Sequence, residues 1–198
     1  PEYLKVVATA KHFAVHSGPE ESRHYFDANT MERDLWETYL PAFRMLVKDA
    51  QVQSVMTAYN RFRGEAASSN KLLFDILRNK WGFDGYVVSD CGAINDIWED
   101  HKITADAASA SALALETGTD LNCGATYKSL KEAIANGLIT EEKINIAIER
   151  LFRARLKLGM FDTEENLGYA TIPFSVNTNA SHTALARKAA QESIVLLK

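Results

Sequence analysis

Four apolar, strand-like runs recur along the chain, and a helix-like segment follows each of them. The runs begin near Lys5, Gln53, Gly85 and Gly118, roughly 30 to 50 residues apart. This alternation is typical of parallel βα units, in which each helix returns the chain to the same end of the sheet. The sequence therefore predicts an α/β fold built on a parallel sheet.

Four strands cannot close an eight-stranded barrel, which needs about 250 residues. The pattern fits either a small open α/β domain or the second half of a TIM-type (β/α)8 barrel whose first half is absent. The chain reaches its first strand within a few residues of Pro1. This abrupt start favours the half-barrel, and we expect residues 1–161 to form it.

The remaining residues predict a change of domain. Residues 162–180 are polar and predict a linker. Ser181 is expected to cap a helix that runs into an apolar strand at residues 193–197. Because a lone strand cannot end a fold, we expect residues 181–198 to be the first helix and strand of a second α/β domain, and the chain to be truncated at both ends.

Local signals place the other elements. Thr30 is expected to cap a helix that continues to Val47, with Pro41 kinking or splitting it. Asn70 is expected to cap the next helix. The irregular polar segment 14–29 predicts a functional loop. Further helices are expected over residues 104–116, 127–136 and 140–158.

Composition limits the partners. The net charge is -4 and the sequence carries no basic patch, which argues against a nucleic-acid partner. No apolar run reaches the roughly 20 residues of a membrane-spanning helix, which argues against a membrane partner. We therefore expect neither class of partner.

A carboxylate follows the third strand-like run. Asp90 comes directly after the run that begins at Gly85, and Gly92 breaks the strand. Barrels and open α/β sheets carry their chemistry at the carboxyl ends of buried strands. Asp90 is therefore a candidate catalytic residue, and the alternative is that it only caps the following helix.

The polar residues at the strand ends can be read together: Lys11-His12, Tyr59, Asp90 and Asp120-Leu121-Asn122, with Arg23 in the first loop. In this order they resemble glycoside hydrolase family 3, whose members carry a retaining β-glycosidase site on a TIM-type barrel. The similarity runs from Lys5 to Lys198. The cysteines that follow Asp90 and Asn122 resemble the β-xylosidase branch, because the β-glucosidase branch usually has a tryptophan where Cys91 stands.

The resemblance implies a retaining exo-β-glycosidase that removes terminal β-linked xylose or glucose from oligosaccharides, with xylose preferred and no cofactor. It implies that Asp90 is the nucleophile. Lys11, His12 and Arg23 would donate to sugar hydroxyls and keep Asp90 ionised. Tyr59 would offer a hydroxyl and an apolar face to the sugar ring.

Such an enzyme needs a second carboxyl group as acid/base, about 5 to 5.5 Å from the first. The resemblance places it in the second domain, beyond Lys198. Glu20, Glu21, Glu99 and Asp100 are weaker candidates within the chain. We therefore expect this chain alone to lack the acid/base.

Two alternatives stay open. The β-N-acetylhexosaminidase branch of the family uses a histidine as acid/base, oriented by an aspartate two residues earlier. His24 stands at a comparable distance after Lys11-His12-Phe13, but Ser22 occupies the orienting position and cannot stabilise an imidazolium as a carboxylate does. The other alternative is a catalytically inactive carbohydrate-binding domain.

The two cysteines lie at equivalent points past neighbouring strands. Cys91 follows Asp90 and Cys123 follows Asn122, so they are about one strand spacing apart and within disulfide reach. We predict a Cys91–Cys123 bridge, and hence an oxidising compartment, periplasmic or extracellular. The alternative is two buried thiols. No metal site is expected, because no further ligands stand at usable spacing.

The residues just after Asp90 are expected to form a solvated polar loop. Asp96, Asp100 and His101 of this loop are weaker candidates for contacts with a second sugar, and Trp98 is a candidate for stacking on an aglycone. His16 is expected to pack within the first loop.

Overall fold

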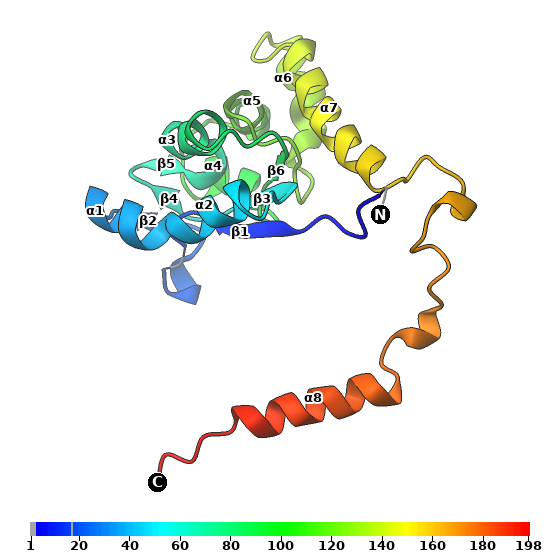
Figure 1. The fold of residues 1–198 in the computed structure, drawn as a ribbon. Coiled ribbons are helices and arrows are strands. Elements are labelled where there is room, and N and C mark those ends of the chain that lie inside the picture. The colour runs from blue at the N-terminus through cyan, green and yellow to red at the C-terminus, as the bar shows by residue number, and fades with distance from the viewer. Residues whose placement is uncertain (1–2, 17) are drawn as a thin grey trace.

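The computed structural model describes residues 3–16 and 18–198. Pro1 and Glu2, which begin the predicted half-barrel, and Ser17 of the predicted loop at 14–29 lie outside the described residues. A three-stranded parallel sheet with the order β1-β3-β6 lies at the centre, with helices packed against it (Figure 1). Its strands are β1 (Thr9–Phe13), β3 (Ser54–Thr57) and β6 (Tyr86–Val88). The chain is a mixed α/β protein with parallel strands, which confirms the prediction at that level.

Each strand of this sheet lies beside the one that precedes it in the chain. β1 pairs with β3, β3 pairs with β6, and Val88 of β6 forms a single parallel bridge with Leu121. The fourth predicted strand, at 118–124, is therefore reduced to one bridge. The reason is that the chain turns away immediately, with Gly118 at a φ of 126° and Gly124 at 138°.

The first strand is displaced from its predicted position. Val6 is 68% exposed, and pairing begins only at Thr9, which lies opposite Ser54. The run of β-branched residues before it has no described partner strand, so propensity alone does not make it a strand. Between Ala10 and Phe13 the register shifts, because three steps along β1 match two along β3. Such a bulge redirects side chains at the end of a strand.

The α-helices lie between and after these strands along the chain. They are α1 (Glu32–Asp34), α2 (Pro41–Lys48), α3 (Lys71–Phe74), α4 (Ala93–Glu99), α5 (Ala107–Thr117), α6 (Leu130–Ala135), α7 (Glu141–Lys157) and α8 (Ala180–Ser193). Two π-helical segments, η2 (Leu35–Tyr39) and η4 (Asp75–Lys80), continue α1 and α3. Short 3-10 turns are η1 (Glu20–Ser22), η3 (Ala67–Ser69), η5 (Thr126–Ser129), η6 (Glu164–Asn166) and η7 (Phe174–Val176).

The predicted caps have mixed outcomes. The Asn70 side chain accepts from the backbone N–H of Leu73 and caps α3, as predicted. Thr30 does not cap the helix that follows it, because α1 begins after Met31 without a side-chain cap. Pro41 opens α2 and separates it from η2, so the predicted split is confirmed. The Asn179 side chain, not Ser181, caps α8.

A second, small sheet fixes the long loop after β1. It joins β2 (Asp27–Ala28), β4 (Arg61–Phe62) and β5 (Glu65–Ala66), all in segments predicted as loops. β4 and β5 form a hairpin whose turn needs Gly64 at a φ of 85°. Because β2 pairs with β4, residues 20–28 are held beside the end of β3.

Aromatic packing fixes the position of β1 in the core. Phe13 is fully buried, with its ring 5.1 Å from Phe43 and 5.9 Å from Trp81. Val55 and Val87 are fully buried on the neighbouring strands. The carboxyl ends of the strands therefore have fixed positions relative to one another.

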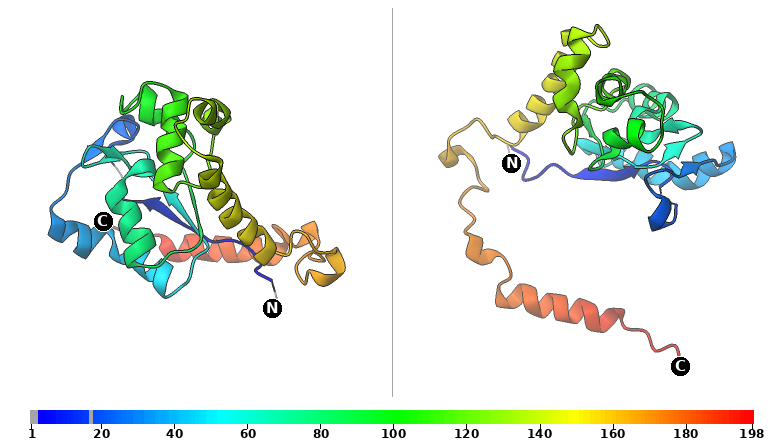
Figure 2. Two further views of the ribbon diagram at one scale, coloured as in Figure 1. Left: turned by 90° about the horizontal axis from the view of Figure 1, so that it is seen from above. Right: turned by 180° about the vertical axis from the view of Figure 1, so that it is seen from behind.

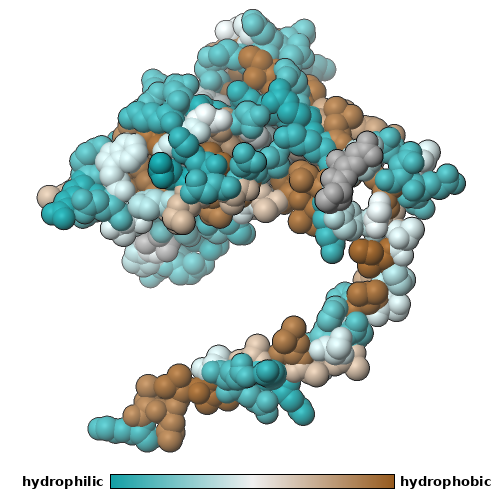
Figure 3. All heavy atoms as spheres, in the orientation of Figure 1, coloured by the Kyte–Doolittle hydropathy of each residue, from teal (hydrophilic) through white to brown (hydrophobic). Residues whose placement is uncertain are grey.

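The chain after α7 leaves this core. Residues 162–179 run along an extended path and α8 lies apart from the sheet, with no buried residue in this helix (Figure 1, Figure 2). The predicted strand at 193–197 is not formed, and Ile194 to Leu197 are 74–89% exposed in an apolar stretch (Figure 3). A strand needs a hydrogen-bonded partner, and the described residues supply none there. Among the described residues, no helix is both long and apolar enough to cross a membrane.

Candidate active site

Asp90 lies where the chain leaves β6 and turns into α4. The N–H of Ser89 still donates to the carbonyl of Leu121 at 2.9 Å, so the strand end stays paired. Oδ1 of Asp90 accepts from the N–H of Cys91 at 2.8 Å. The N-cap of α4 is Gly92, at a φ of 90°, and no side chain caps this helix. The alternative that Asp90 serves only as the helix cap is therefore wrong.

His12 faces this carboxylate from the end of β1. The bulge between Ala10 and Phe13 contains His12, whose Nε2 lies 3.2 Å from Oδ2 of Asp90. The Asp90 side chain is only 13% exposed and that of His12 25%, so the pair is largely shielded from water. Burial lowers the pKa of His12, although the nearby Asp90 opposes this. A neutral imidazole with one N–H donor suits this position.

Tyr59 and Arg23 complete the group around Asp90. The Tyr59 hydroxyl donates to the carbonyl of Cys91 at 2.9 Å. Burial raises the pKa of Tyr59, and the adjacent Asp90 carboxylate raises it further, so the hydroxyl stays protonated. The guanidinium carbon of Arg23 lies 5.0 Å from the centre of the Tyr59 ring. The structure thus brings together Asp90, His12, Tyr59 and Arg23.

Lys11 lies at the rim of this group. It is exposed, and together with His12 it lines a pocket of about 340 Å³ between β1 and the α2 side of the molecule. His16 lines the same pocket, with its ring 5.0 Å from that of His12. Lys11 therefore lies at the predicted strand end, and its role in sugar binding stays a prediction.

A disulfide bond joins Cys91 to Cys123. The N–H of Gly92 donates to the carbonyl of Cys123 at 2.8 Å, and the N–H of Cys123 donates to Oγ of Ser89 at 3.0 Å. The bond therefore ties the Asp90 loop to the segment after Leu121, at a point where hydrogen bonds already hold the two together.

We expect thiol titration of the denatured, unreduced protein to find no reactive thiol, because both cysteines are in the bridge. The same protein denatured with reductant should give two thiols, which controls for reagent access. Two thiols without reductant would contradict the bridge.

The segment after Asp90 is not the solvated loop that the sequence predicts. It is α4, and Asp96 and His101 are each only 5% exposed. His101 is held by the carbonyl of Tyr59, 2.9 Å from its Nε2, and burial lowers its pKa. Trp98 is half-buried and donates to Oδ1 of Asn95 at 3.2 Å. The side chains of Asp96 and His101 are thus buried, so neither is available to contact a second sugar.

The weaker acid/base candidates are exposed residues. Glu20 pairs with Arg23 at 2.8 Å, Glu99 pairs with Asn95, and Glu21 and Asp100 are exposed. Glu20 and Glu99 thus pair with residues other than Asp90. Within the described ranges, no group of three or more His, Cys, Asp or Glu side chains is arranged to hold a metal ion.

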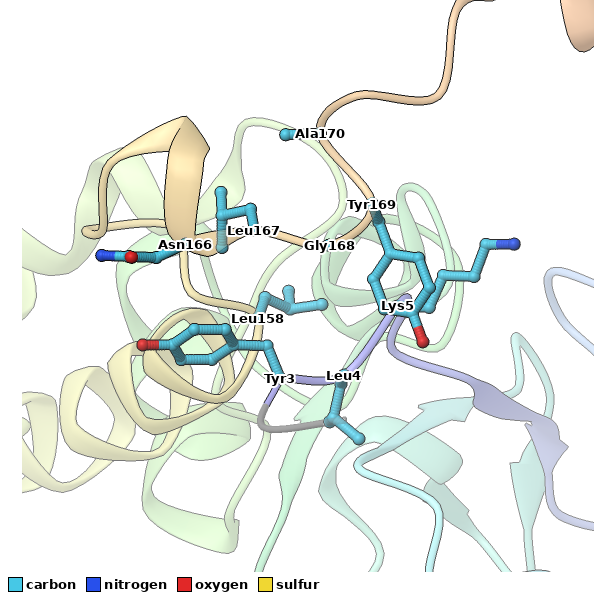
Figure 4. A pocket seen from close by; sticks show the side chains of 9 residues that line it. All are labelled: Tyr3, Leu4, Lys5, Leu158, Asn166, Leu167, Gly168, Tyr169 and Ala170. Atoms are coloured by element: carbon cyan, nitrogen blue, oxygen red, sulfur yellow. The ribbon is translucent and has the colours of Figure 1, made fainter.

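One pocket lies apart from this group. A pocket of about 530 Å³ is lined by residues 3–5 before β1, Leu158 and residues 166–170 (Figure 4). In the close-up, Tyr3 and Tyr169 lie on either side of Leu4 and Leu158, and no residue that contacts Asp90 lines the pocket. It is therefore not part of the candidate active site.

Sequence reasoning missed a buried ion cluster beneath the site. Asp120, with a side chain only 2% exposed, accepts from Arg78, Arg150 and the N–H of Val87, each at 2.8 Å. Burial raises the pKa of the Asp120 carboxyl, and the two guanidinium groups oppose this by stabilising the carboxylate. Burial also lowers the pKa of Arg78 to about 10, so it stays charged at neutral pH. The cluster fixes β6, and Asp90 follows just after this strand.

Sequence reasoning also missed the contact between His24 and Asp96. Nδ1 of His24 lies 2.8 Å from Oδ2 of Asp96, although 72 residues separate the two in the chain. Ser22, the position weighed as the orienting residue, donates to the carbonyl of Pro19 instead. The available sequence signal was the place of Asp96 between Ala93 and Ile97, on the apolar face of a helical pattern.

Comparisons with known proteins identify the family of this chain. Residues 2–154 match the glycosyl hydrolase family 3 N-terminal domain. The chain is 44% identical to a xylan 1,4-beta-xylosidase of Xylanibacter ruminicola over 99% of its length, which is 23% of that protein. It is 43% identical over its whole length to a probable exo-1,4-beta-xylosidase of Aspergillus clavatus, of which it covers 27%. The chain thus spans about a quarter of the length of these relatives.

Solved structures give the same result. A GH3 exo-beta-xylosidase in complex with a xylobiose aziridine activity-based probe superposes with a TM-score of 0.91 at 35% identity, over 100% of this chain and 26% of that one. A beta-glucosidase from Erythrobacter marinus superposes with a TM-score of 0.88 at 29% identity, over 100% of this chain and 27% of that one. The resemblance drawn from the sequence is confirmed, and the chain belongs to glycosyl hydrolase family 3.

Proposed function

We propose that this chain is the nucleophile-bearing part of a retaining exo-β-glycosidase, which removes terminal β-linked xylose or glucose from oligosaccharides. The observation that carries the proposal is the Asp90 carboxylate, shielded at the end of β6 with Nε2 of His12 3.2 Å from Oδ2. Tyr59 and Arg23 lie beside it. A carboxylate with donors around it suits attack on a sugar whose hydroxyls those donors hold.

In the proposed first step, a carboxylate oxygen of Asp90 bonds to the anomeric carbon while the bond to the leaving oxygen breaks. The leaving oxygen takes a proton from the acid/base, and a glycosyl-aspartate intermediate remains. Water then attacks the anomeric carbon, gives its proton back to the acid/base and releases Asp90. The backbone N–H of Cys91 donates to Oδ1 of Asp90 and holds the carboxylate in place for this attack.

The neighbouring side chains have separate roles in this scheme. A neutral His12 donates one N–H, either to Asp90 or to a sugar hydroxyl. The Tyr59 hydroxyl donates to the Cys91 carbonyl, so its oxygen accepts from a sugar hydroxyl at the same rim. Arg23 and Lys11 are the cations that bind sugar hydroxyls. The acid/base comes from a part of the protein outside residues 1–198, and this chain alone does not turn over.

We propose xylose as the preferred sugar. The relatives described above are named xylosidases, and a glucosidase superposes with a lower score. Xylose lacks the hydroxymethyl arm of glucose, so a pocket closed at that position selects it. The Cys91–Cys123 bridge also supports an oxidising compartment, periplasmic or extracellular.

The domain organisation is part of the same proposal. Residues 1–161 form the second half of a (β/α)8 barrel, residues 162–180 a linker, and residues 181–198 the start of a second α/β domain. Two observations support this: the strands lie side by side in chain order, and α8 lies apart from the core. The exposed stretch from Ile194 to Leu197 would then pair within the second domain.

Labelling by 2-fluoro sugars tests the function. A fluorine at C2 slows both steps, and an activated leaving group restores the first, so a retaining enzyme accumulates its glycosyl intermediate. Incubating the full-length protein with 2-fluoro-xyloside and 2-fluoro-glucoside inactivators should give a stable mass adduct. Peptide mapping should place it on Asp90, with faster labelling by the xyloside. No adduct on folded protein would contradict the proposal.

A second candidate is a β-N-acetylhexosaminidase, because a carboxylate does face His24, from Asp96 rather than from Ser22. That function requires the other imidazole nitrogen to give a proton to the leaving group, and Nε2 accepts from Nε of Arg23 at 3.3 Å. Hydrolysis of nitrophenyl N-acetyl-β-glucosaminide faster than of the matching xyloside would favour this candidate. An inactive carbohydrate-binding domain would bind xylose without forming an adduct.

A further inference from the structure

A chain of three side chains connects the interior of the protein to the active-site rim. Oδ2 of Asp96, in α4, lies 2.8 Å from Nδ1 of His24. Nε of Arg23 donates to Nε2 of the same imidazole at 3.3 Å. α4 begins just after Asp90, and His24 and Arg23 lie on the long loop after β1. The contacts therefore join α4 to the long loop after β1, and both border the proposed sugar site.

The Arg23 contact determines where the imidazole proton lies. A guanidinium has only donors, so Nε2 of His24 must be the acceptor. The proton of the neutral ring is then on Nδ1, and it points at Asp96, which accepts it. A carboxylate bound to one ring nitrogen fixes the tautomer and orientation of a histidine, as happens when a carboxylate binds the free nitrogen of a metal-bound histidine.

Asp96 is held in an unfavourable place for a charge. It is 5% exposed, next to the fully buried Ile97, and burial raises its pKa to about 6. A carboxyl that only filled space there would be better replaced by an apolar residue. Its contact with His24 gives it a specific role.

At the other end, Arg23 is fixed in three ways. Its Nε is bound to His24, its Nη1 is paired with Glu20 at 2.8 Å, and its guanidinium lies 5.0 Å from the Tyr59 ring centre. The His24 ring itself lies 4.4 Å from the Tyr59 ring. The two contacts to His24 and Glu20 use two of five guanidinium N–H donors, which leaves others for sugar hydroxyls.

We propose that Asp96 and His24 are positioning residues, which hold the Arg23 guanidinium over Tyr59 in the orientation that binds the sugar. This inference rests on the proposed function and names how one substrate contact is held. Neither residue exchanges a proton with the substrate.

A double-mutant cycle on the full-length enzyme tests whether His24 acts through Arg23. The readout is kcat/KM for nitrophenyl xyloside. We expect His24→Ala and Arg23→Ala each to lower kcat/KM roughly 10- to 100-fold, because a misplaced positioning group costs up to about 100-fold. The double variant should lose no more than Arg23→Ala alone, since His24 would act only through Arg23. If the losses of the two single variants multiply in the double variant, His24 acts independently of Arg23 and the proposal is overturned.

Conservative replacement of Asp96 separates positioning from folding. Asp96→Asn keeps an oxygen that accepts from Nδ1 of His24 and should stay within about threefold of the parent, whereas Asp96→Leu should match His24→Ala. Asp75→Asn is the matched control, because this carboxylate also accepts a side-chain hydrogen bond, from Asn79, outside the site. Equal losses for Asn and Leu at position 96, in protein with unchanged thermal stability, would overturn the proposal.

The nature of the leaving group separates a positioning role from an acid/base role. Loss of a positioning residue should cost the same with activated and with unactivated leaving groups, whereas loss of an acid costs far more with unactivated ones. A leaving-group-dependent loss in His24→Ala would overturn the proposal. Labelling of Asp90 by 2-fluoro-xyloside in the parent enzyme distinguishes failure of this proposal from failure of the proposed function. If Asp90 is not labelled, the proposed function fails. If Asp90 is labelled and the losses of the two single variants multiply, only the positioning role of His24 and Asp96 is refuted.

Discussion

Asp90→Ala should reduce the turnover of the full-length enzyme by at least roughly 10⁴-fold, because removing a nucleophile leaves only the binding and charge-stabilising parts of the site. The side chain is 13% exposed and stands beyond the end of β6, and its Oδ1 accepts one backbone hydrogen bond. We therefore expect the fold to form without it. We expect the circular dichroism spectrum and the thermal midpoint to be nearly unchanged, with kcat on nitrophenyl xyloside as the measurement.

A small external anion gives the matching control for Asp90→Ala. The deleted carboxylate leaves a space on the face of the sugar from which Asp90 is proposed to attack. Azide or formate should therefore restore part of the turnover of the variant with an activated substrate, without stimulating the parent. With azide the product should be a glycosyl azide of inverted anomeric configuration. Near-normal activity in Asp90→Ala without added anion would exclude Asp90 as the nucleophile.

Asp120→Asn should lower the free energy of unfolding by about 3–5 kcal/mol, the usual cost of removing one partner from a buried ion cluster. The change leaves Arg78 and Arg150, with side chains 14% and 26% exposed, facing each other without the carboxylate. It also weakens the acceptor of the Val87 N–H. Urea denaturation followed by circular dichroism measures the loss.

Two further variants test this explanation of the cluster. Asp84→Asn is the control, because Asp84 is 73% exposed and meets Arg153 only at 3.8 Å; a change within about 1 kcal/mol is expected. Combining Asp120→Asn with Arg150→Met should recover part of the loss, since it removes one unpaired charge. A loss under about 1 kcal/mol for Asp120→Asn would show that the cluster is not structural.

The sequence predicts the order of strands and helices well because that information is local. An apolar run ending in Asp90, or an asparagine before an apolar helix as at Asn70, is visible within a few residues. The predicted position of the first strand was wrong, because the strand begins only at Thr9, where Ser54 provides a pairing partner. The strand predicted at 193–197 failed for the same reason.

The residues of the candidate site show the same difference between local and long-range information. Asp90, His12, Tyr59 and Arg23 could be named because they stand at strand ends or in the first loop, in an order that resembles a family. The pairing of His24 with Asp96 spans 72 residues, and that of Arg78 with Asp120 spans 42. Such pairs depend on how helices pack on the sheet, and no local pattern encodes it.

The Cys91–Cys123 bond has a consequence for proteolysis. The two cysteines are 32 residues apart, and the chain between them holds α4, α5 and the exposed turn at Lys102. A protease that cuts this turn opens a covalent ring instead of releasing a fragment. The Asp90 loop then stays attached to both ends of the cut chain, so a nicked molecule can keep its shape until a reductant reaches the bond.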